Sequence, residues 1–326
     1  MNESAPPPIE VGVGGWAYLP VRNVSRLELC AQIFDFVEVN STFYKLPPLK
    51  QTEKWRANVP ENFEFTVRAS SKLTHQNHME PTEENFAEFS KSMDVCRALR
   101  SGILHFQFPP SFPITGEIVR NWRQFFQSLN KIRDVHYAFE IRNAETAKVD
   151  HVRKFLSDFD IIPTSDASRE KRLETSSRSG ILYSRIFGLG DRTRWSFSTD
   201  ELMALKEKVE KLPAARRYLT FHNISMYEDG ARMKNVIKEG KDILPLREVG
   251  LASFKRAMIA ARIDFPVSKE TLVSDMGWRT IDIGKDTSIH ADKILSDLTE
   301  GESYNSMDDV LRKISLSTRT VSSQPQ

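Results

Sequence analysis

Short apolar runs alternate with amphipathic stretches along most of this 326-residue chain. The alternation is typical of repeated βα units, in which buried parallel strands are joined by helical crossovers. The pattern predicts eight strands, over residues 10–15, 35–40, 63–69, 103–108, 136–142, 161–166, 181–188 and 217–223. Eight strands with helical crossovers favour an α/β fold of the TIM-type (β/α)8 barrel class over an open sheet.

Several of the expected crossovers carry a clear apolar stripe at helical spacing. This spacing predicts helices over residues 83–99, 117–129 and 147–159. Ser198 and Thr199, followed by two acidic residues, give a start signal for a further helix. Cys96 lies on the apolar stripe of the first of these helices, so we expect it to be packed in the core.

The rhythm of strands and helices changes beyond about residue 240. A helix is expected over 251–261, and Ser306 and Asp309 have the spacing of a capping box before a later helix. The predicted division is a disordered N-terminus, a barrel, a linker helix with a small and mostly helical C-terminal module, and a disordered tail. Their bounds are 1–9, 10–245, 246–316 and 317–326.

Charge and cysteine content narrow the class of protein. The formal net charge is +2, so overall composition gives no reason to expect indiscriminate nucleic-acid binding. The two cysteines have no paired spacing, which argues against a disulfide scaffold or a thiolate metal site. No secretion signal is recognised at the N-terminus, and no apolar run approaches about 18 residues. We therefore expect a cytoplasmic protein with no membrane partner.

Polar and aromatic side chains gather where the predicted strands end. The segment VEVNSTFYKLP, residues 37–47, places a dense row of them directly after the second strand. Residues at the carboxyl ends of parallel strands line the site that a barrel normally uses. Read in this way, the candidate catalytic residues are Glu38 and Glu140. The candidate ligand-binding residues are Trp16, Asn40, Tyr44, Arg68, His75, Gln107, Arg142, Asp166, Arg185 and Asn223.

Glu38 and Glu140 are the carboxylates best placed for proton transfer. Burial in a barrel mouth raises the pKa of a glutamate towards neutrality, whereas a nearby arginine holds it ionised. Glu140 and Arg142 lie two residues apart in one strand and therefore point to one face. The alternative to a catalytic role is that these two form a satisfied ion pair while Glu38 is a hydrogen-bonding member of the core.

Basic residues crowd the same strand ends and loops although the whole chain is almost neutral. Such clustering indicates an anionic ligand, and phosphate is the common reason to gather guanidinium groups around a cleft. Trp16, Tyr18, Tyr44 and Trp195 could stack a base or a sugar beside them. The alternative to a ligand site is that the clustering arose by chance, because 28% of all residues are charged and some loops will therefore be basic. The basic residues concerned are Lys45, Arg68, Lys72, Arg142, Arg169, Lys171, Arg172, Arg185, Arg192 and Arg194.

Metal and cofactor motifs are weak. His75 and His78 have a spacing that permits metal ligation, and His222 and Asp166 could join His75. However, the sequence has no HxH or HExxH pattern. GLGD at 188–191 lacks the residues that complete a phosphate loop. We therefore expect neither a bound metal nor a cofactor.

Six motifs in order resemble those of the domain of unknown function 72, or YecE-like, family. They are GVGGWAY (12–18), VEVNSTFYKLP (37–47), FEFTVRASSKLTH (63–75), ILHFQFPPSF (103–112), AFEIRN (138–143) and the segment 183–188. The resemblance covers roughly residues 11–232 and implies a TIM-type barrel, but it brings no established reaction. Proposals of a nucleic-acid or phosphodiester role for this family rest on analogy with barrel endonucleases. The family usually carries a histidine where this chain has Phe187, and two asparagines where it has His222 and Asn223.

Three hypotheses about function follow. In the first, the protein binds a phosphate-bearing small molecule or nucleic acid and hydrolyses or processes it without a metal. Glu140 would be the acid or base, Glu38 its partner, and Arg68, Arg142 and Arg185 the anion holders. In the second, it is a sugar-active hydrolase that uses paired carboxylates. In the third, it is a non-catalytic binding or scaffold protein. Protein partners and the substrate are left open by the sequence.

Overall fold

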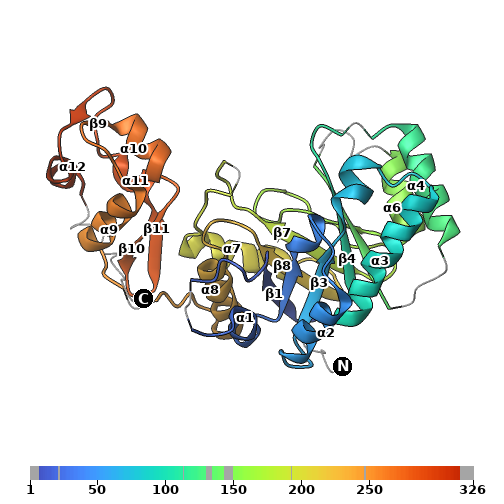
Figure 1. The fold of residues 1–326 in the computed structure, drawn as a ribbon. Helices are drawn as coiled ribbons and strands as arrows, with labels where there is room; N and C mark the ends of the chain where they lie inside the picture. Colours follow the sequence, from blue (N-terminus) through green and yellow to red (C-terminus); the bar gives the residue numbers. More distant parts are fainter. Residues whose placement is uncertain are drawn as a thin grey trace, which may run out of the picture. The chain divides into compact units, whose positions relative to one another are not determined.

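Eight parallel strands form a single sheet in the order β6-β5-β4-β3-β2-β1-β8-β7 (Figure 1). The computed structural model describes residues 7–20, 23–112, 114–129, 134–142, 150–191, 193–245 and 247–315. The sheet is nearly closed, because Ser165 beyond β6 pairs in parallel with Ser184 of β7. This confirms the predicted TIM-type barrel. The strands are β1 (Ile9–Val13), β2 (Phe36–Val39), β3 (Glu64–Arg68), β4 (Ile103–Phe108), β5 (His136–Ile141), β6 (Ile162–Pro163), β7 (Ile181–Ile186) and β8 (Arg216–Phe221).

Each of the eight predicted strands is present, and most bounds agree within about two residues. β6 is the exception, since only Ile162–Pro163 pairs as a strand where 161–166 was expected. Pro163 has no N–H to donate to a neighbouring strand, which shortens the regular ladder. The chain then returns to the sheet at Ser165, whose carbonyl accepts a 2.9 Å hydrogen bond from the N–H of Arg185.

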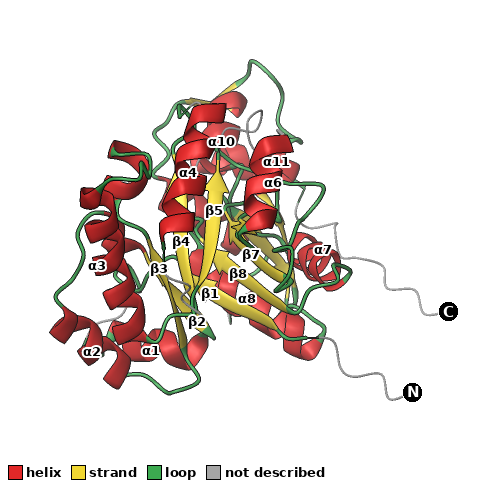
Figure 2. Ribbon diagram, turned by 90° about the vertical axis from the view of Figure 1, so that its right-hand side faces the viewer, coloured by secondary structure: helices red, strands yellow, loops and turns green. Residues whose placement is uncertain are grey.

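Helices α1 to α4 and α6 lie on the outside of the strands (Figure 2). α3 confirms the predicted helix 83–99. α4 and α6 confirm the helices predicted over 117–129 and 147–159 to within a few residues, although residues 147–149 lie outside the described residues. α1, α2, α8 and two short turns of 3₁₀ and π helix were not predicted. The bounds are α1 (Arg26–Ile33), η1 (Asn40–Phe43), α2 (Leu49–Ala57), η2 (Lys72–Gln76), α3 (Glu83–Leu99), α4 (Gly116–Ser128), α6 (Asp150–Asp158), α7 (Thr199–Glu210) and α8 (Met226–Glu239).

The barrel interior is filled in layers by side chains that alternate along the strands. The lowest layer is apolar and includes Phe36, Ile103, Ala138, Ile181 and Tyr218. Because side chains have a period of two along a strand, the next inward residues lie two positions on. They are polar and include Glu38, His105, Glu140 and Tyr183. Inside the barrel, a layer of polar side chains thus lies next to a layer of buried apolar side chains.

The chain divides into two compact units. One comprises residues 1–186 and 209–222 and contains the whole barrel sheet; the other comprises 187–208 and 223–326. The predicted boundary between barrel and module at 245/246 stays a prediction. Within the second unit, residues 251–313 hold α9 (Leu251–Ala261), β9 (Val267–Ser268), α10 (Lys269–Met276), β10 (Thr280–Gly284), β11 (Thr287–His290), α11 (Ala291–Leu295), β12 (Ser303–Tyr304) and α12 (Met307–Lys313).

This C-terminal module has its own apolar core, built around Phe254, Leu272, Met276, Ile281 and Val310. Its helices agree with the predicted mostly helical module, and α9 has the predicted bounds. Two pairs of short antiparallel strands, β10 with β11 and β9 with β12, were not expected. The Ser306 hydroxyl accepts a hydrogen bond from the Asp309 N–H, so the predicted N-terminal cap is confirmed. The predicted disordered ends, except for residues 7–9, lie outside the described residues.

Candidate functional site

Arg185 of β7 is the centre of a buried ionic network inside the barrel. Its Nη2 lies 3.0 Å from Glu38 Oε1 of β2, and its Nη1 lies 2.5 Å from Glu140 Oε2 of β5. The Nη1 group also donates to Gln107 Oε1 on β4 at 3.2 Å. Arg185 is 3% exposed, so the network lies below the rim at which these residues were expected.

The two glutamates differ in access to solvent. The Glu38 side chain is fully buried, and its second oxygen accepts a 2.7 Å hydrogen bond from the Tyr183 hydroxyl. The Glu140 side chain is 11% exposed and also pairs with Arg142 Nε at 2.5 Å. The ion pair between Glu140 and Arg142 that was weighed as an alternative is therefore present.

Both glutamates are held as carboxylates. Burial alone would raise their pKa values, but the Arg185 guanidinium, with His222 and His105, lowers the pKa of Glu38 to about 2. The pKa of Glu140 is held well below its usual range, chiefly by Arg185 against the same effect of burial. Two ionised carboxylates around one arginine therefore form the electrostatic core of the site.

His105 was not predicted as a site residue. It lies on β4, two residues before Gln107, with Nδ1 3.5 Å from Glu38 Oε2 and Nε2 3.4 Å from Glu140 Oε2. Neither ring nitrogen has a hydrogen bond of acceptable geometry among the described residues. Complete burial lowers the pKa of His105 even though two carboxylates flank it. Gln107 was predicted because it lies near the end of β4; counting back two residues along the same face of the strand would also have found His105.

His222 follows β8 and lies against the same arginine. Arg185 Nε donates to His222 Nε2 at 3.2 Å, and burial together with Arg185 lowers the pKa of His222 to about 3. The ring is therefore neutral near pH 7. A methyl group added at Gly14 would lie 2.3 Å from His222 Nδ1, so the close approach of β1 requires glycine.

Arg68 ends β3 and lies over the ring of Phe43, with its guanidinium carbon 3.8 Å from the ring centroid. Its Nε is buried without a hydrogen-bond partner among the described residues, and the guanidinium forms no ion pair with them. The pKa of Arg68 is lowered to about 10 by burial and then by Arg185, which still leaves it a cation near neutral pH. The ring of His75 packs edge-on against Phe43 at 4.8 Å.

The segment 40–43 holds this arrangement in place. The Thr42 hydroxyl lies 2.6 Å from the carbonyl oxygens of both Val39 and Arg68, which ties the end of β2 to the end of β3. Asn40 Nδ2 donates to the Gly14 carbonyl at 2.9 Å, whereas Asn40 Oδ1 is buried with no partner among the described residues. Asn40 Oδ1 is thus an acceptor, and Arg68 Nε a donor, that form no hydrogen bond with the described residues.

The remaining predicted residues lie elsewhere. Tyr44 is 81% exposed and packs on Phe43, and Asp166 forms a 3.3 Å ion pair with Arg169 in its own loop. Trp16 packs against Trp55 rather than on the network. Asn223 belongs to the second unit, where its amide donates to Asp229 at 2.6 Å. Arg192 lies outside the described residues.

The described residues offer neither a metal centre nor a membrane span. They contain no group of three or more histidine, cysteine, aspartate or glutamate side chains that could hold a metal ion. No helix in the described part of the chain combines the length and apolar character needed to cross a membrane.

Comparison with solved structures gives the same fold. A DUF72 family protein from Thermotoga maritima MSB8 aligns with a TM-score of 0.60 at 19% identity, over 71% of this chain and 99% of that chain. A DUF72 family protein from Enterococcus faecalis V583 aligns with a TM-score of 0.58 at 21% identity, over 74% of this chain and 99% of the other. At these identities the likeness is one of fold alone.

Sequence comparison places the chain among proteins of undefined function. It is 31% identical to UPF0759 protein YunF of Bacillus subtilis over 41% of this chain and 51% of YunF. It is 28% identical to UPF0759 protein YecE of Escherichia coli K12 over 42% of this chain and 49% of YecE. The chain thus matches about half the length of these curated relatives. The model of the protein family of unknown function DUF72 matches residues 10–241, which include all of the barrel sheet except Ile9 at the start of β1, and the protein therefore belongs to the DUF72 family.

Proposed function

We propose that this protein binds a phosphate-bearing ligand, a nucleotide or a nucleic acid, at the carboxyl-terminal end of its barrel. Arg68 carries the proposal, because its side chain is partly buried, its Nε has no hydrogen-bond partner and its guanidinium forms no ion pair among the described residues. Partial burial of a cation without a counter-ion is costly, and such groups gather at functional sites.

The charges around Arg68 support an anionic ligand. Glu38 and Glu140 are ionised, and their two negative charges are balanced by Arg185 and Arg142. Arg68 adds a third cation to this group. The low pKa values of His105 and His222 mean that neither imidazole alters the balance near pH 7. A phosphate oxygen would neutralise the surplus charge, and the planar guanidinium fork suits phosphate geometry.

The same geometry suggests which group would move a proton if the ligand is hydrolysed. Glu140 is the more accessible of the two carboxylates, and its lowered pKa keeps it ionised, which is the form that can accept a proton. In this proposal Glu140 accepts a proton from the attacking water as the water oxygen bonds to phosphorus. The bond from phosphorus to the leaving oxygen breaks, and that oxygen takes up a proton from solvent, while Glu38 fixes Arg185 behind Glu140. Glu140→Gln should then abolish turnover while leaving ligand affinity largely intact.

The alternative of a sugar hydrolase receives less support from this arrangement. Glycoside hydrolysis by paired carboxylates needs one of them protonated, with a raised pKa. Here the pKa values of Glu38 and Glu140 are both lowered. A non-catalytic binding or scaffold role predicts no turnover by the wild-type protein, so any turnover that Glu140→Gln abolishes would exclude it.

Salt-dependent binding tests the proposal. A fluorescein-labelled single-stranded DNA octamer would be titrated with the protein at several salt concentrations by fluorescence anisotropy. Each phosphate contact to a single strand contributes about 0.7 to the slope of log K against log salt. Arg68→Ala should weaken binding at low salt and reduce that slope by about 0.7.

Arg97→Ala is the matched control, because Arg97 is an exposed arginine of α3 that pairs with Asp94. It should leave both affinity and slope unchanged. Binding by wild type that is insensitive to salt, or equal effects of the two substitutions, would contradict the proposal.

A further inference from the structure

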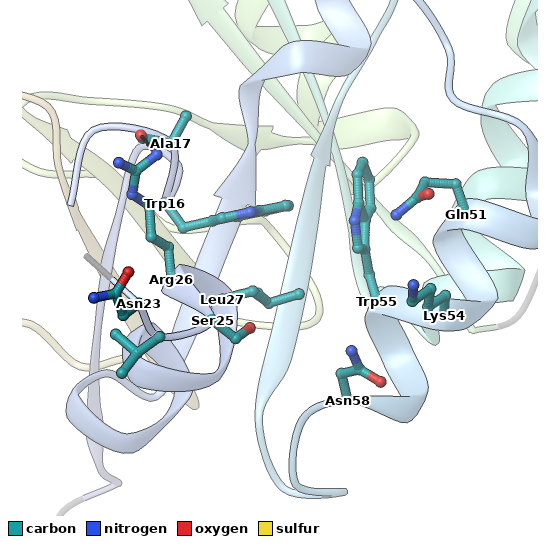
Figure 3. Close-up of a pocket in the computed structure, with 11 residues that line it drawn as sticks. Trp16, Ala17, Asn23, Ser25, Arg26, Leu27, Gln51, Lys54, Trp55 and Asn58 are labelled. Atoms are coloured by element: carbon teal, nitrogen blue, oxygen red, sulfur yellow. Dashed lines mark hydrogen bonds between the residues drawn. The ribbon is translucent and has the colours of Figure 1, made fainter. Parts of the chain in front are cut away.

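A cavity of about 770 Å³ opens between the loop after β1, the start of α1 and helix α2 (Figure 3). None of its lining residues belongs to the ionic network, and all of them come from the first unit. Its size falls in the range of about 300–1,000 Å³ that small-molecule sites occupy. The lining includes two tryptophans, two basic residues and four side chains with amide or hydroxyl groups.

The two tryptophans give the cavity a flat aromatic surface. In Figure 3 the indole of Trp16 extends from the β1–α1 loop towards the indole of Trp55 on α2. The ring centroids are 5.1 Å apart with an interplanar angle of 82°. Both side chains are only half-buried. This edge-to-face pair holds both rings in place and leaves indole surface on which a planar group can stack.

Basic and amide groups surround these rings. Lys54 of α2 is exposed and forms no ion pair among the described residues. Arg26 Nη1 donates to the Ala17 carbonyl at 3.0 Å, which fixes the loop that carries Trp16. Gln51 and Asn58 of α2 add amide groups that both donate and accept hydrogen bonds. A planar ligand with polar edges and a negative charge matches this lining.

The cavity adjoins the ionic network through a short piece of chain. The Gly14 carbonyl accepts the amide of Asn40, and Trp16 follows only two residues later. Two residues span at most about 7 Å. Gly14 lies against the network, since a methyl group there would meet His222 Nδ1 at 2.3 Å and Asn40 Nδ2 at 3.1 Å, and Asn40 Oδ1 is buried without a partner among the described residues. A ligand with its planar part on Trp16 could therefore reach Asn40 with another part.

We infer that the cavity of Trp16 and Trp55 binds the base of a nucleotide whose phosphate lies beside Arg68. The inference rests on the proposed function and names the part of the ligand that the ionic network does not contact. Base stacking on an aromatic side chain tolerates all four bases, and polar groups such as Gln51 and Asn58 would add only a modest preference. The nucleotide is either free or part of a single strand.

Two probes with the same phosphates test this inference on the wild-type protein. The first is the fluorescein-labelled octamer, made of deoxyadenylate, and the second is an octamer of abasic sites. Stacking of one base is worth about 5-fold to 150-fold in affinity. The wild type should therefore bind the deoxyadenylate octamer at least about 5-fold more tightly than the abasic octamer.

Substitutions then locate the preference. Trp16→Leu and Trp55→Leu should each reduce the ratio of the two affinities markedly, because leucine keeps an apolar side chain but has no flat face. Tyr18→Leu is the matched control, since Tyr18 is an exposed aromatic residue of the same loop that does not line the cavity. Circular dichroism and melting temperature report whether each variant is folded. If a variant does not fold, the affinities of the wild type for the two octamers still test the inference.

The outcomes separate this inference from the proposed function. Equal wild-type affinity for both octamers, with both weakened by Arg68→Ala, would overturn the base site and leave the phosphate site intact. Probes that do not bind, or that bind Arg68→Ala as well as wild type, would overturn both. If the wild type does prefer the deoxyadenylate octamer, a competition experiment with AMP identifies the ligand. Displacement of the octamer by AMP would show that a free nucleotide is enough for binding, and no displacement would show that the ligand is a single strand.

Discussion

The guanidinium of Arg185 on β7 lies 3.0 Å from the carboxylate of Glu38 on β2, although 147 positions separate the two residues in the chain. Both side chains are almost inaccessible to solvent. Glu140 completes the group on the other side of the guanidinium. One buried arginine thus bridges two carboxylates from opposite halves of the sheet order, and Arg142 supplies the second positive charge that balances them.

Arg185→Met should reduce stability at neutral pH by about 3–5 kcal/mol, since removing one partner of a buried ion pair leaves uncompensated charge. Urea unfolding at pH 7 measures the loss. The deficit should shrink at pH 5, because Glu38 and Glu140 would take up protons more readily once the cation is gone. Arg97→Met, at an exposed arginine of α3, is the control and should stay within about 0.5 kcal/mol of wild type. A deficit independent of pH would mean that the carboxylates are not the cause.

His222→Asn should flatten the dependence of stability on pH below about 6.5. Burial and Arg185 lower the pKa of His222 from 6.5 to about 3, so the unfolded chain binds a proton in this window that the folded protein excludes. The contribution of His222 to stability is therefore present above pH 6.5 and is lost as the pH falls towards 3, by roughly 1.4 kcal/mol per pH unit. Urea unfolding between pH 7.5 and 5 measures the slope. His151→Asn, at an exposed histidine of α6, should keep the wild-type slope.

Arg68→Ala should have little effect on stability. The guanidinium has no polar partner among the described residues, and its packing over Phe43 is worth about 0.5–1 kcal/mol. Thermal unfolding would therefore show a small shift, while anisotropy shows weakened binding of the DNA octamer. A loss of stability as large as that of Arg185→Met would instead make Arg68 a structural member of the core.

Gly14→Ala should destabilise the protein by about 1–3 kcal/mol, the usual cost of inserting a methyl group where there is no room. The added carbon would meet the His222 ring at 2.3 Å and the Asn40 amide at 3.1 Å. Gly102→Ala is the matched control, since a methyl group there meets nothing within 4 Å and no left-handed conformation is involved. Equal melting temperatures for the two variants would show that the contact with His222 relaxes freely.

The barrel followed from the sequence because its strands are short and flanked by turn signals. β4, for example, has the predicted bounds, because a run of six buried residues lies between Gly102 and Pro109. Within this run, apolar residues alternate with His105 and Gln107. α3 was equally clear, because its buried residues recur at helical spacing over 17 residues. α1 and α2 were missed because they bury few apolar side chains; in α2 the fully buried residue is Thr52.

The candidate site was predicted in part. Glu38, Gln107, Glu140, Arg142 and Arg185 were identified from their strand-end positions, and they do meet in the structure. His105 was missed because it lies in mid-strand, where a single histidine in an apolar run is usually a core residue. Trp55 was missed because the helix that carries it gave no signal.

The strands, the helices α3, α4, α6 and α9, the inward alternation of polar residues and the DUF72 membership could be derived from the amino-acid sequence, because they depend on local periodicity and on ordered motifs. The pairing of the charges could be read from the folded barrel alone. Closing the barrel brings Glu38, Glu140 and Arg185 together and leaves Arg68 over Phe43 without a counter-ion among the described residues. Pairing, burial and the resulting pKa shifts depend on distances between residues far apart in the chain, and no local pattern encodes those distances.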